Sequence, residues 1–207
     1  MKLPLITLSF FLFSYQITLS QDTDEQVKDT NGNPIFPGGK FYIMPAIFGS
    51  TGGGVRLGET NNSSCPTTVL QDYSEVIKGL PVQFQIPGIS PGIIFTDITR
   101  LNIVFVEKPE CVESSKWVVI RDGFSSFSIG IGGVEEYGDG TLKGLFSIKK
   151  HVFGYKLVFC PRYTAPPGVC HDIGRYDDEN GRRLILTDNE PFEPFEVVLV
   201  DATESSI

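Results

Sequence analysis

The chain has 207 residues, with 17 basic and 25 acidic side chains and a formal charge of −8 at pH 7. An acidic balance disfavours a nucleic acid or an anionic membrane surface as partner, because both require clustered Lys and Arg. The 22 glycines and 14 prolines, set between short apolar runs, indicate a chain with many turns.

Residues 1–20 have the pattern of a secretion signal. Lys2 is their only charge, an apolar run extends from Leu3 to Leu19, and the small Ser20 precedes a polar stretch. Polar residues and a proline interrupt the run, which favours a cleaved signal over a membrane anchor. We therefore expect one mature domain, residues 21–207, that is secreted to the extracellular space or cell wall, or enters the vacuole. Removing Lys2 leaves 16 basic against 25 acidic residues, a charge of −9.

After this leader, apolar and polar residues alternate in short runs bounded by Gly, Pro, Asn and Asp. This period of two predicts strands, and no segment shows a convincing helical period. The predicted strands include residues 82–86, 101–105, 156–159, 183–186 and 195–200. Asn180-Gly181 predicts a hairpin, because a type I′ turn needs positive φ at both central residues. Gly52-Gly53-Gly54 lacks the Lys and the context of a phosphate loop and is predicted to be a flexible turn.

A weak internal repeat is visible. Residues 41–45, 116–120 and 155–159 each place an aromatic residue at or near the head of an apolar run, with an average spacing of about 57 residues. Three such units fit the mature chain. A closed three-fold barrel would leave few exposed strand edges, but these residues do not separate a trefoil from a sandwich.

Four cysteines follow the leader: Cys65, Cys111, Cys160 and Cys170. An even number in a secreted chain indicates two disulfides rather than redox or metal chemistry. Sequence order suggests Cys65–Cys111 and Cys160–Cys170, although four cysteines allow three connectivities.

Asn61 and Asn62 begin two overlapping N-x-S sequons just before the first cysteine. In a secreted protein such a sequon is a glycan acceptor and lies in a surface loop. We treat both as glycosylation candidates; an unused polar loop is the alternative.

Several segments carry a family resemblance. VKDTNGNPI at 27–35, GGKFYIM at 38–44, WVV from Trp117 and YKLVFCP at 155–161 resemble, in order and spacing, the soybean-type Kunitz protease inhibitors of plants. The resemblance covers essentially the whole mature chain. It implies an all-β fold, a β-trefoil of twelve short strands, with the two disulfides suggested above. It also implies a monomeric inhibitor of a serine protease that is not an enzyme and needs no cofactor.

In the family that the chain resembles, one exposed loop after the first half-cystine delivers inhibition. Alignment from Cys65 places it within residues 86–94, and the reactive residues are Pro87, Gly88, Ile89, Ser90, Pro91 and Gly92. A loop already held in a substrate-like conformation loses little entropy on docking, and two prolines restrict φ. Because Cys65–Cys111 brackets this loop in the sequence, we expect it to rigidify the loop more than Cys160–Cys170 does.

The residue that enters the protease pocket has two candidates. Counting from Cys65 gives Ile89, and counting back from the following strand gives Pro91. Trypsin requires Arg or Lys in its acidic pocket, yet residues 86–96 carry no charge. Ile suits an elastase-like or subtilisin-like pocket, so strong trypsin inhibition is not expected. In addition, Pro37 stands where the resembled family usually has an Asn that supports the loop; a non-inhibitory storage, defence or miraculin-like trefoil is the alternative.

The same loop also fits G-x-S-x-G, the nucleophile elbow of hydrolases. That motif needs a helix after the Ser and an N–H on the next residue; Pro91 has no N–H, and residues 93–96 predict a strand. His151 and His171 belong to no supporting motif, so we predict neither an enzyme nor a metal site. The acidic runs at 135–136 and 177–179 are predicted to be solvated turns rather than a glycosidase carboxylate pair. Trp117 is predicted to pack in the core.

Overall fold

The computed structural model describes residues 24–47, 49, 51–60, 64–88, 92–122, 126–133, 137–163, 168–179, 181–187 and 193–203. The leader, the sequon residues Asn61 and Asn62, and the reactive-loop residues Ile89, Ser90 and Pro91 lie outside the described residues.

The described residues form thirteen strands and one short 3-10 turn, η1 (Gly138–Gly140). The strands are β1 (Lys40–Pro45), β2 (Val55–Gly58), β3 (Thr68–Gln71), β4 (Val82–Gln85), β5 (Asn102–Phe105), β6 (Trp117–Asp122), β7 (Ser126–Ile131), β8 (Thr141–Leu142), β9 (Gly144–Lys150), β10 (Tyr155–Pro161), β11 (His171–Asp178), β12 (Gly181–Thr187) and β13 (Glu196–Asp201). All five strands predicted from the alternating pattern are confirmed, as β4, β5, β10, β12 and β13. No helix in the described part of the chain is long and apolar enough to cross a membrane.

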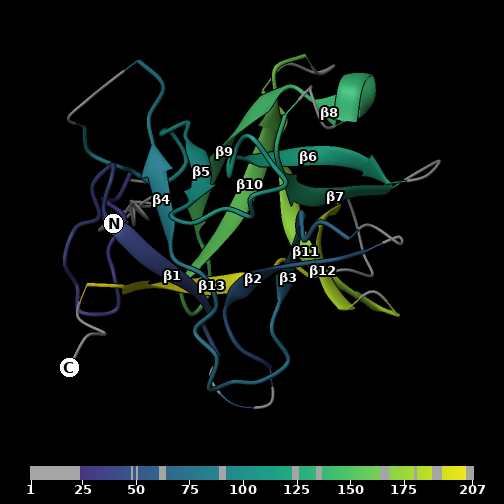
Figure 1. The fold of residues 1–207 in the computed structure, drawn as a ribbon. Coiled ribbons are helices and arrows are strands. Elements are labelled where there is room, and N and C mark those ends of the chain that lie inside the picture. The colour runs from purple at the N-terminus through teal and green to yellow at the C-terminus, as the bar shows by residue number, and fades with distance from the viewer. Residues whose placement is uncertain are drawn as a thin grey trace, which may run out of the picture.

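Six of the strands close into a barrel, which occupies the left of Figure 1. Antiparallel pairing connects β5, β4, β1, β13, β10 and β9 in that order. A bridge between Leu101 and Phe146 joins the β5 end of this series to β9 and completes the ring. Because successive side chains of a strand point to opposite faces, Ile103 and Phe105 of β5 enter the core and are at most 2% exposed.

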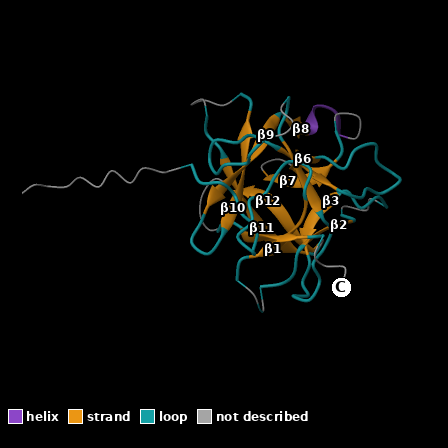
Figure 2. Cartoon of the chain, turned by 90° about the vertical axis from the view of Figure 1, so that its left-hand side faces the viewer, coloured by secondary structure: helices purple, strands orange, loops and turns teal. Residues whose placement is uncertain are grey.

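Three hairpins, β2–β3, β6–β7 and β11–β12, cover one end of the barrel. They meet one another through Thr68 opposite Gly130, Ser128 opposite Ile185, and Arg182 opposite Gln71. Figure 2 shows the strands crowded at the centre of the molecule with loops projecting around them. Three four-strand units of barrel strand, hairpin and barrel strand make a β-trefoil, which confirms the fold class. The thirteenth strand is the two-residue β8, which adds to β6 and lies outside the predicted twelve.

The repeat unit differs from the one inferred from the sequence. The three units are residues 40–85, 102–150 and 155–201, and each begins with a barrel strand. Residues 41–45 and 155–159 therefore occupy equivalent positions in β1 and β10, but 116–120 belongs to the hairpin strand β6. The true counterpart is β5, whose first residues carry no aromatic side chain and so gave no signal.

Trp117 lies in the core, as predicted, with 1% of its surface exposed. Its ring centroid is 5.6 Å from that of Phe105 and 6.1 Å from that of Phe146, and Phe146 is 5.2 Å from Phe159. Such offset or edge-to-face aromatic contacts stabilise a core beyond their burial of apolar area. This aromatic cluster joins β5, β6, β9 and β10.

The hairpin predicted at Asn180-Gly181 is β11–β12, although the turn is shifted by one residue. Gly181 pairs with Asp178, so the two central positions are 179 and 180, and residue 180 is outside the described part. Gly181 has a φ of 109°, which is a conformation that glycine adopts without a steric cost.

Candidate functional site

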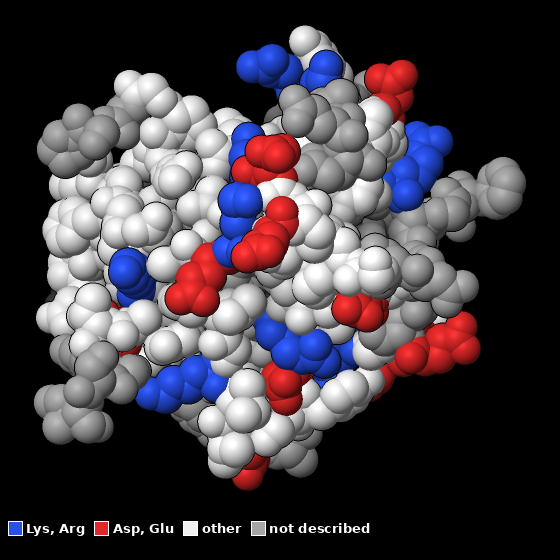
Figure 3. All heavy atoms as spheres, viewed as in Figure 1, with Lys and Arg blue, Asp and Glu red and all other residues white. Residues whose placement is uncertain are grey.

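The predicted reactive loop is the connection between β4 and β5. Gln85 pairs with Asn102 where the two strands meet this connection. Ile86 is half-buried against the core, whereas Pro87 and Gly88 are exposed. In Figure 3 the side of the molecule around this connection is largely free of charged residues. The loop thus leaves a fixed strand end and immediately becomes accessible.

The far side of the loop is anchored at Ile94. Ile93 is 47% exposed, but Ile94 is fully buried, and its carbonyl oxygen accepts a hydrogen bond of 2.9 Å from the amide of Val27. Glu25 adds two bonds: its carbonyl oxygen accepts from the amide of Thr96 at 2.8 Å, and its amide donates to Thr96 Oγ1 at 3.1 Å. We call residues 25–27, which make these contacts, the N-terminal clamp.

A tight turn follows the clamp. Asp97 has a φ of 62°, the only positive φ of a non-glycine residue among those described. Its amide donates to the carbonyl oxygen of Ile148 at 2.8 Å, and its own carbonyl oxygen accepts from Arg100 Nη1 at 2.6 Å. The prediction of a strand at residues 93–96 is wrong, because only Phe95 forms an isolated bridge, and the segment then turns back.

Pro37 lies in a turn beside β4. The amide of Gly38 donates to the carbonyl oxygen of Phe84 at 3.1 Å, and Gln83 Nε2 donates to the carbonyl oxygen of Gly38 at 2.9 Å. The turn is therefore fixed to the strand that leads into the loop. Because the proline ring carries no hydrogen-bond donor, the described support of the loop comes from its two flanks rather than from a side chain at position 37.

Both cysteine pairs form as sequence order suggested, Cys65–Cys111 and Cys160–Cys170. The first pair fastens the connection between β5 and β6. That connection leaves β5 at Phe105, which faces Val82, whereas the reactive loop enters at the opposite end of the same two strands. The longer bridge therefore holds the end of the β4–β5 pair that is remote from the loop, contrary to the expectation from sequence order.

The shorter disulfide is the one that approaches the loop. Arg100 Nη2 lies 3.8 Å from Cys170 Sγ, while the other end of the same guanidinium holds the turn at Asp97. Cys160 and Pro87 also line one common cavity. Arg100 thus connects this disulfide to the C-terminal flank of the loop.

A shallow apolar cavity of about 390 Å³ lies against the foot of the loop. Its lining includes Pro87, Ile93 and Ile98, and Ile93 and Ile98 are 47% and 58% exposed. Sequence reasoning did not single out Ile98, because an isolated apolar residue in a loop carries no signal until the fold places it beside the reactive segment. These side chains enlarge the apolar surface that the loop presents.

Among the described residues, the two histidines lie on different elements. His151 Nδ1 lies 3.0 Å from Glu196 Oε1 at the β9–β10 turn, and His171 belongs to β11. Within the described ranges no group of three or more His, Cys, Asp or Glu is placed to hold a metal ion. Residues 135 and 136 of the first acidic run lie outside the described part of the chain.

The second acidic run is engaged in structural contacts. Asp177 accepts a hydrogen bond of 2.5 Å from the hydroxyl of Tyr73, and this bond raises the pKa of the tyrosine. Asp178 forms an ion pair of 2.6 Å with Arg183. Asp178 is thus paired across the β11–β12 hairpin, and Asp177 is bonded to the connection between β3 and β4.

Residues 27–198 match the Kunitz_legume family, which is described as trypsin and protease inhibitor. The chain is 54% identical over 206 residues to the Kunitz-type trypsin inhibitor-like 2 protein of Pisum sativum, covering 95% of this chain and 92% of that protein. It is 50% identical over 183 residues to the subtilisin inhibitor CLSI-II of Canavalia lineata, covering 86% and 92%. A solved structure, a Kunitz type trypsin inhibitor from Cicer arietinum, is 60% identical with a TM-score of 0.78, covering 86% of this chain and 99% of that one. The similarity thus spans the barrel, the hairpins and the loop connection together.

Proposed function

Because the chain belongs to the legume Kunitz family of trypsin and protease inhibitors, we propose that it inhibits a serine protease as a monomer through residues 87–92. Ile89 enters the primary pocket of the protease, and Ile89–Ser90 is the bond presented for cleavage. The target is an elastase-like or subtilisin-like enzyme rather than trypsin.

The observation that carries this proposal is an exposed connection between two fixed ends. β4 holds one end at Gln85, and the clamp holds the other at Ile94. Fixed ends reduce the conformational entropy that the loop loses on docking, so more of the contact energy appears as affinity. They also keep the two chain ends together after cleavage, which favours re-formation of the bond over release.

The chemistry of the loop supports the choice of target. Residues 86–96 contain no Lys or Arg for an acidic pocket. The neighbouring Ile93 and Ile98 extend an apolar surface on the same side. The relative from Canavalia lineata, at 50% identity, is named as a subtilisin inhibitor. An apolar residue in the primary pocket with apolar flanking contacts fits this class.

Location and processing belong to the same proposal. We expect cleavage after Ser20 and passage through an oxidising compartment, which two disulfides require. N-terminal sequencing of the plant protein checks the cleavage site, and loss of mass on treatment with an N-glycosidase checks Asn61 and Asn62. An intact leader on the isolated protein would contradict the proposal.

The first prediction concerns the pocket residue. The mature protein should inhibit subtilisin or elastase and leave trypsin, chymotrypsin and papain largely unaffected. Ile89→Arg should reverse this preference and raise affinity for trypsin by at least tenfold, because a guanidinium would then reach the acidic pocket. Steady-state inhibition constants measure both effects.

A matched control is Val152→Arg, which adds the same charge at a 75% exposed position on the β9–β10 turn. It should change none of the inhibition constants. If no protease of the panel is inhibited and Ile89→Arg gains nothing against trypsin, the loop proposal fails. That result would favour a non-inhibitory storage or defence protein, the alternative suggested by Pro37 and by the lack of a basic loop residue.

A further inference from the structure

A second cavity, of about 720 Å³, lies beside the barrel at the foot of the loop. It is bounded by β5, β6, β8, β9 and β10, and by Arg162 and Gly168 beyond the end of β10. Six of its lining residues define what we call the basic groove: Arg100, Asn102, Lys116, Trp117, Lys143 and Arg162.

The basic groove concentrates positive charge in an acidic protein. Four cations line it, and none of the residues that line it is acidic. Across the described part of the chain, none of these four side chains forms an ion pair, whereas Lys156 and Arg183 each lie within 3 Å of an aspartate oxygen. A concave site lined by charges of one sign raises the local concentration of the opposite ion.

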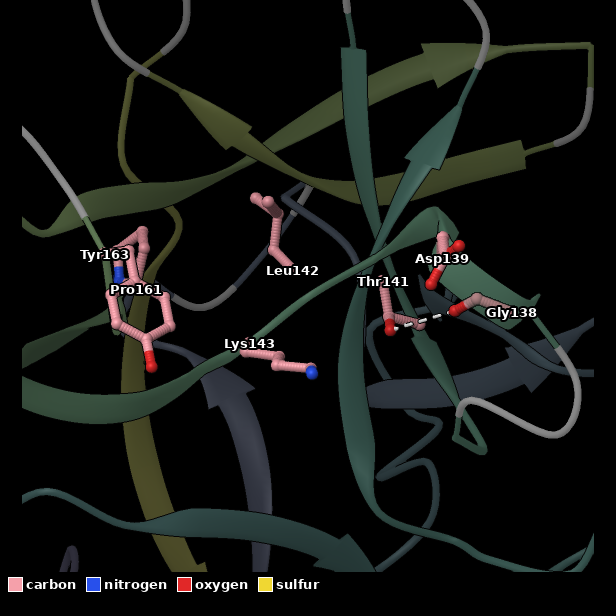
Figure 4. A pocket seen from close by; sticks show the side chains of 7 residues that line it. All are labelled: Gly138, Asp139, Thr141, Leu142, Lys143, Pro161 and Tyr163. Atoms are coloured by element: carbon pink, nitrogen blue, oxygen red, sulfur yellow. Dashed lines mark hydrogen bonds between the residues drawn. The ribbon is translucent and has the colours of Figure 1, made fainter.

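Lys143 lies between β8 and β9, Arg162 follows β10, and the two residues are neighbours just beyond the β9–β10 pairing. The amide of Arg162 donates to the carbonyl oxygen of Lys143 at 2.8 Å. Figure 4 shows the hollow that adjoins the groove: Pro161 and Tyr163 lie on one side, Thr141 and Gly138 lie on the other, and Lys143 extends between them. Asp139 lines that hollow, but it does not line the groove itself.

Two buried polar atoms at the groove lack partners among the described residues. They are Nε1 of Trp117, which can only donate, and Oδ1 of Asn102. The Trp117 side chain is 1% exposed, so its N–H is removed from bulk solvent. Buried polar groups are normally hydrogen-bonded, so the indole N–H favours an acceptor and the Asn102 oxygen favours a donor. The preference for negative charge comes from the four cations.

The remaining lining is apolar. Val118, Leu142 and Leu145 are half-buried and line the same cavity. A volume of this size, with apolar walls and a few convergent polar groups, is typical of sites for small organic molecules. The groove can therefore contact both a charged end and an apolar body of one ligand.

We propose that the basic groove binds a small organic anion, a carboxylate on an apolar body. The carboxylate lies near Lys143 and Arg162, and the body lies against Leu142 and Leu145, beside Trp117. The six residues of the basic groove all lie outside the reactive residues 87–92, although Pro87 lines the same cavity, so anion binding is tested separately from protease inhibition.

The single tryptophan of the chain allows a specific test. In a ¹⁵N-labelled mature protein, the one indole N–H cross-peak reports on Trp117 alone. Titration with trans-cinnamate should move this peak saturably with a dissociation constant below about 1 mM. Cinnamamide, which has the same body without the charge, should bind at least tenfold more weakly.

Paired variants connect the binding to the groove. Lys143→Gln with Arg162→Gln should weaken cinnamate at least tenfold, while Lys149→Gln with Lys150→Gln, two cations of β9 outside the groove, should leave it unchanged. Retained dispersion of the other amide peaks shows that each variant is folded. The proposal is overturned if cinnamate does not move the indole peak, if cinnamamide binds equally well, if the groove variant keeps full affinity, or if inorganic sulfate competes as strongly as cinnamate binds.

Discussion

At Gly53 and Gly54 a single added Cβ would clash with the neighbouring backbone. The sequence predicted a flexible turn here, but both residues are buried, and a Cβ at Gly54 would lie 2.0 Å from the carbonyl oxygen of Lys78. The prediction was wrong because close backbone packing also selects glycine. Gly54→Ala should lower the free energy of unfolding by about 1–3 kcal/mol or more, measured by urea denaturation. Gly140→Ala, where a Cβ would meet nothing within 4 Å, should change it by less than about 0.5 kcal/mol.

The hydrogen bond between Tyr73 and Asp177 makes the free energy of unfolding depend on pH in the alkaline range. The Tyr73 hydroxyl donates to Asp177, and this hydrogen bond raises the pKa of the tyrosine above its ordinary value of 10.0. A folded-state pKa above the unfolded one means that the native protein holds the proton more tightly. The stabilising effect is therefore fully present below pH 10 and is lost as the pH rises through the folded pKa.

The matching variant is Tyr73→Phe, which keeps the ring stacked near Arg182 and removes only the hydroxyl. The difference in urea midpoint between the wild type and this variant should be constant at neutral pH and should shrink above pH 10. A difference that grows with alkaline pH would contradict the sign of the shift.

Among the elements, the N-terminal clamp connects the start of the mature chain to the loop. Thr96 is 2% exposed, and its Oγ1 accepts the amide of Glu25. Thr96→Val keeps the shape but leaves that amide without its acceptor, so it should cost about 1–3 kcal/mol of stability. Because the clamp fixes the C-terminal flank of the loop, inhibition of the target protease should weaken several-fold.

A matched variant separates the clamp from general destabilisation. Thr187→Val changes another buried threonine, whose Oγ1 donates to the carbonyl oxygen of Asp172 in the β11–β12 hairpin. It should cost a similar amount of stability and leave the inhibition constant unchanged. Equal loss of inhibition in both variants would show that the clamp has no special role in holding the loop.

Individual strands could be predicted from the sequence, but contacts between distant segments could not. Strands such as β4, β5 and β13 were predictable because one face packs on the core and the other does not, which imposes a period of two. The contact of Glu25 with Thr96 spans 71 positions and leaves no local pattern. The same holds for the basic groove, whose cations lie on separate connections that only barrel closure brings together.

At the scale of the whole molecule, net charge describes the surface poorly. The chain carries −8 overall, which disfavours a polyanion as a general partner, yet one concave site is lined by four cations and no acid. Composition averages over positions, whereas a ligand senses the potential of one cavity. A small anion and an acidic protein are therefore compatible.

The two disulfides should separate global stability from inhibition. In the chain-entropy model a bridge that spans 46 positions stabilises by about 4 kcal/mol and one that spans 10 positions by about 3 kcal/mol. Replacing both cysteines of the Cys65–Cys111 pair by serine should therefore lower the free energy of unfolding more. The Cys160–Cys170 pair contacts Arg100, which holds the turn after the loop, so its replacement should weaken inhibition more.

Urea denaturation and inhibition constants of the two double variants, measured well below their unfolding midpoints, test this crossed ranking. Arg100→Lys provides a further arm, because an ammonium cannot span Asp97 and Cys170 with two separate donors as the guanidinium does. It should reproduce part of the loss of inhibition with both disulfides intact. The prediction is wrong if the Cys65–Cys111 variant loses more stability and also more inhibition, and if Arg100→Lys inhibits normally. In that case the disulfide that encloses the loop in the sequence supports it, and the contact between Arg100 and Cys170 does not.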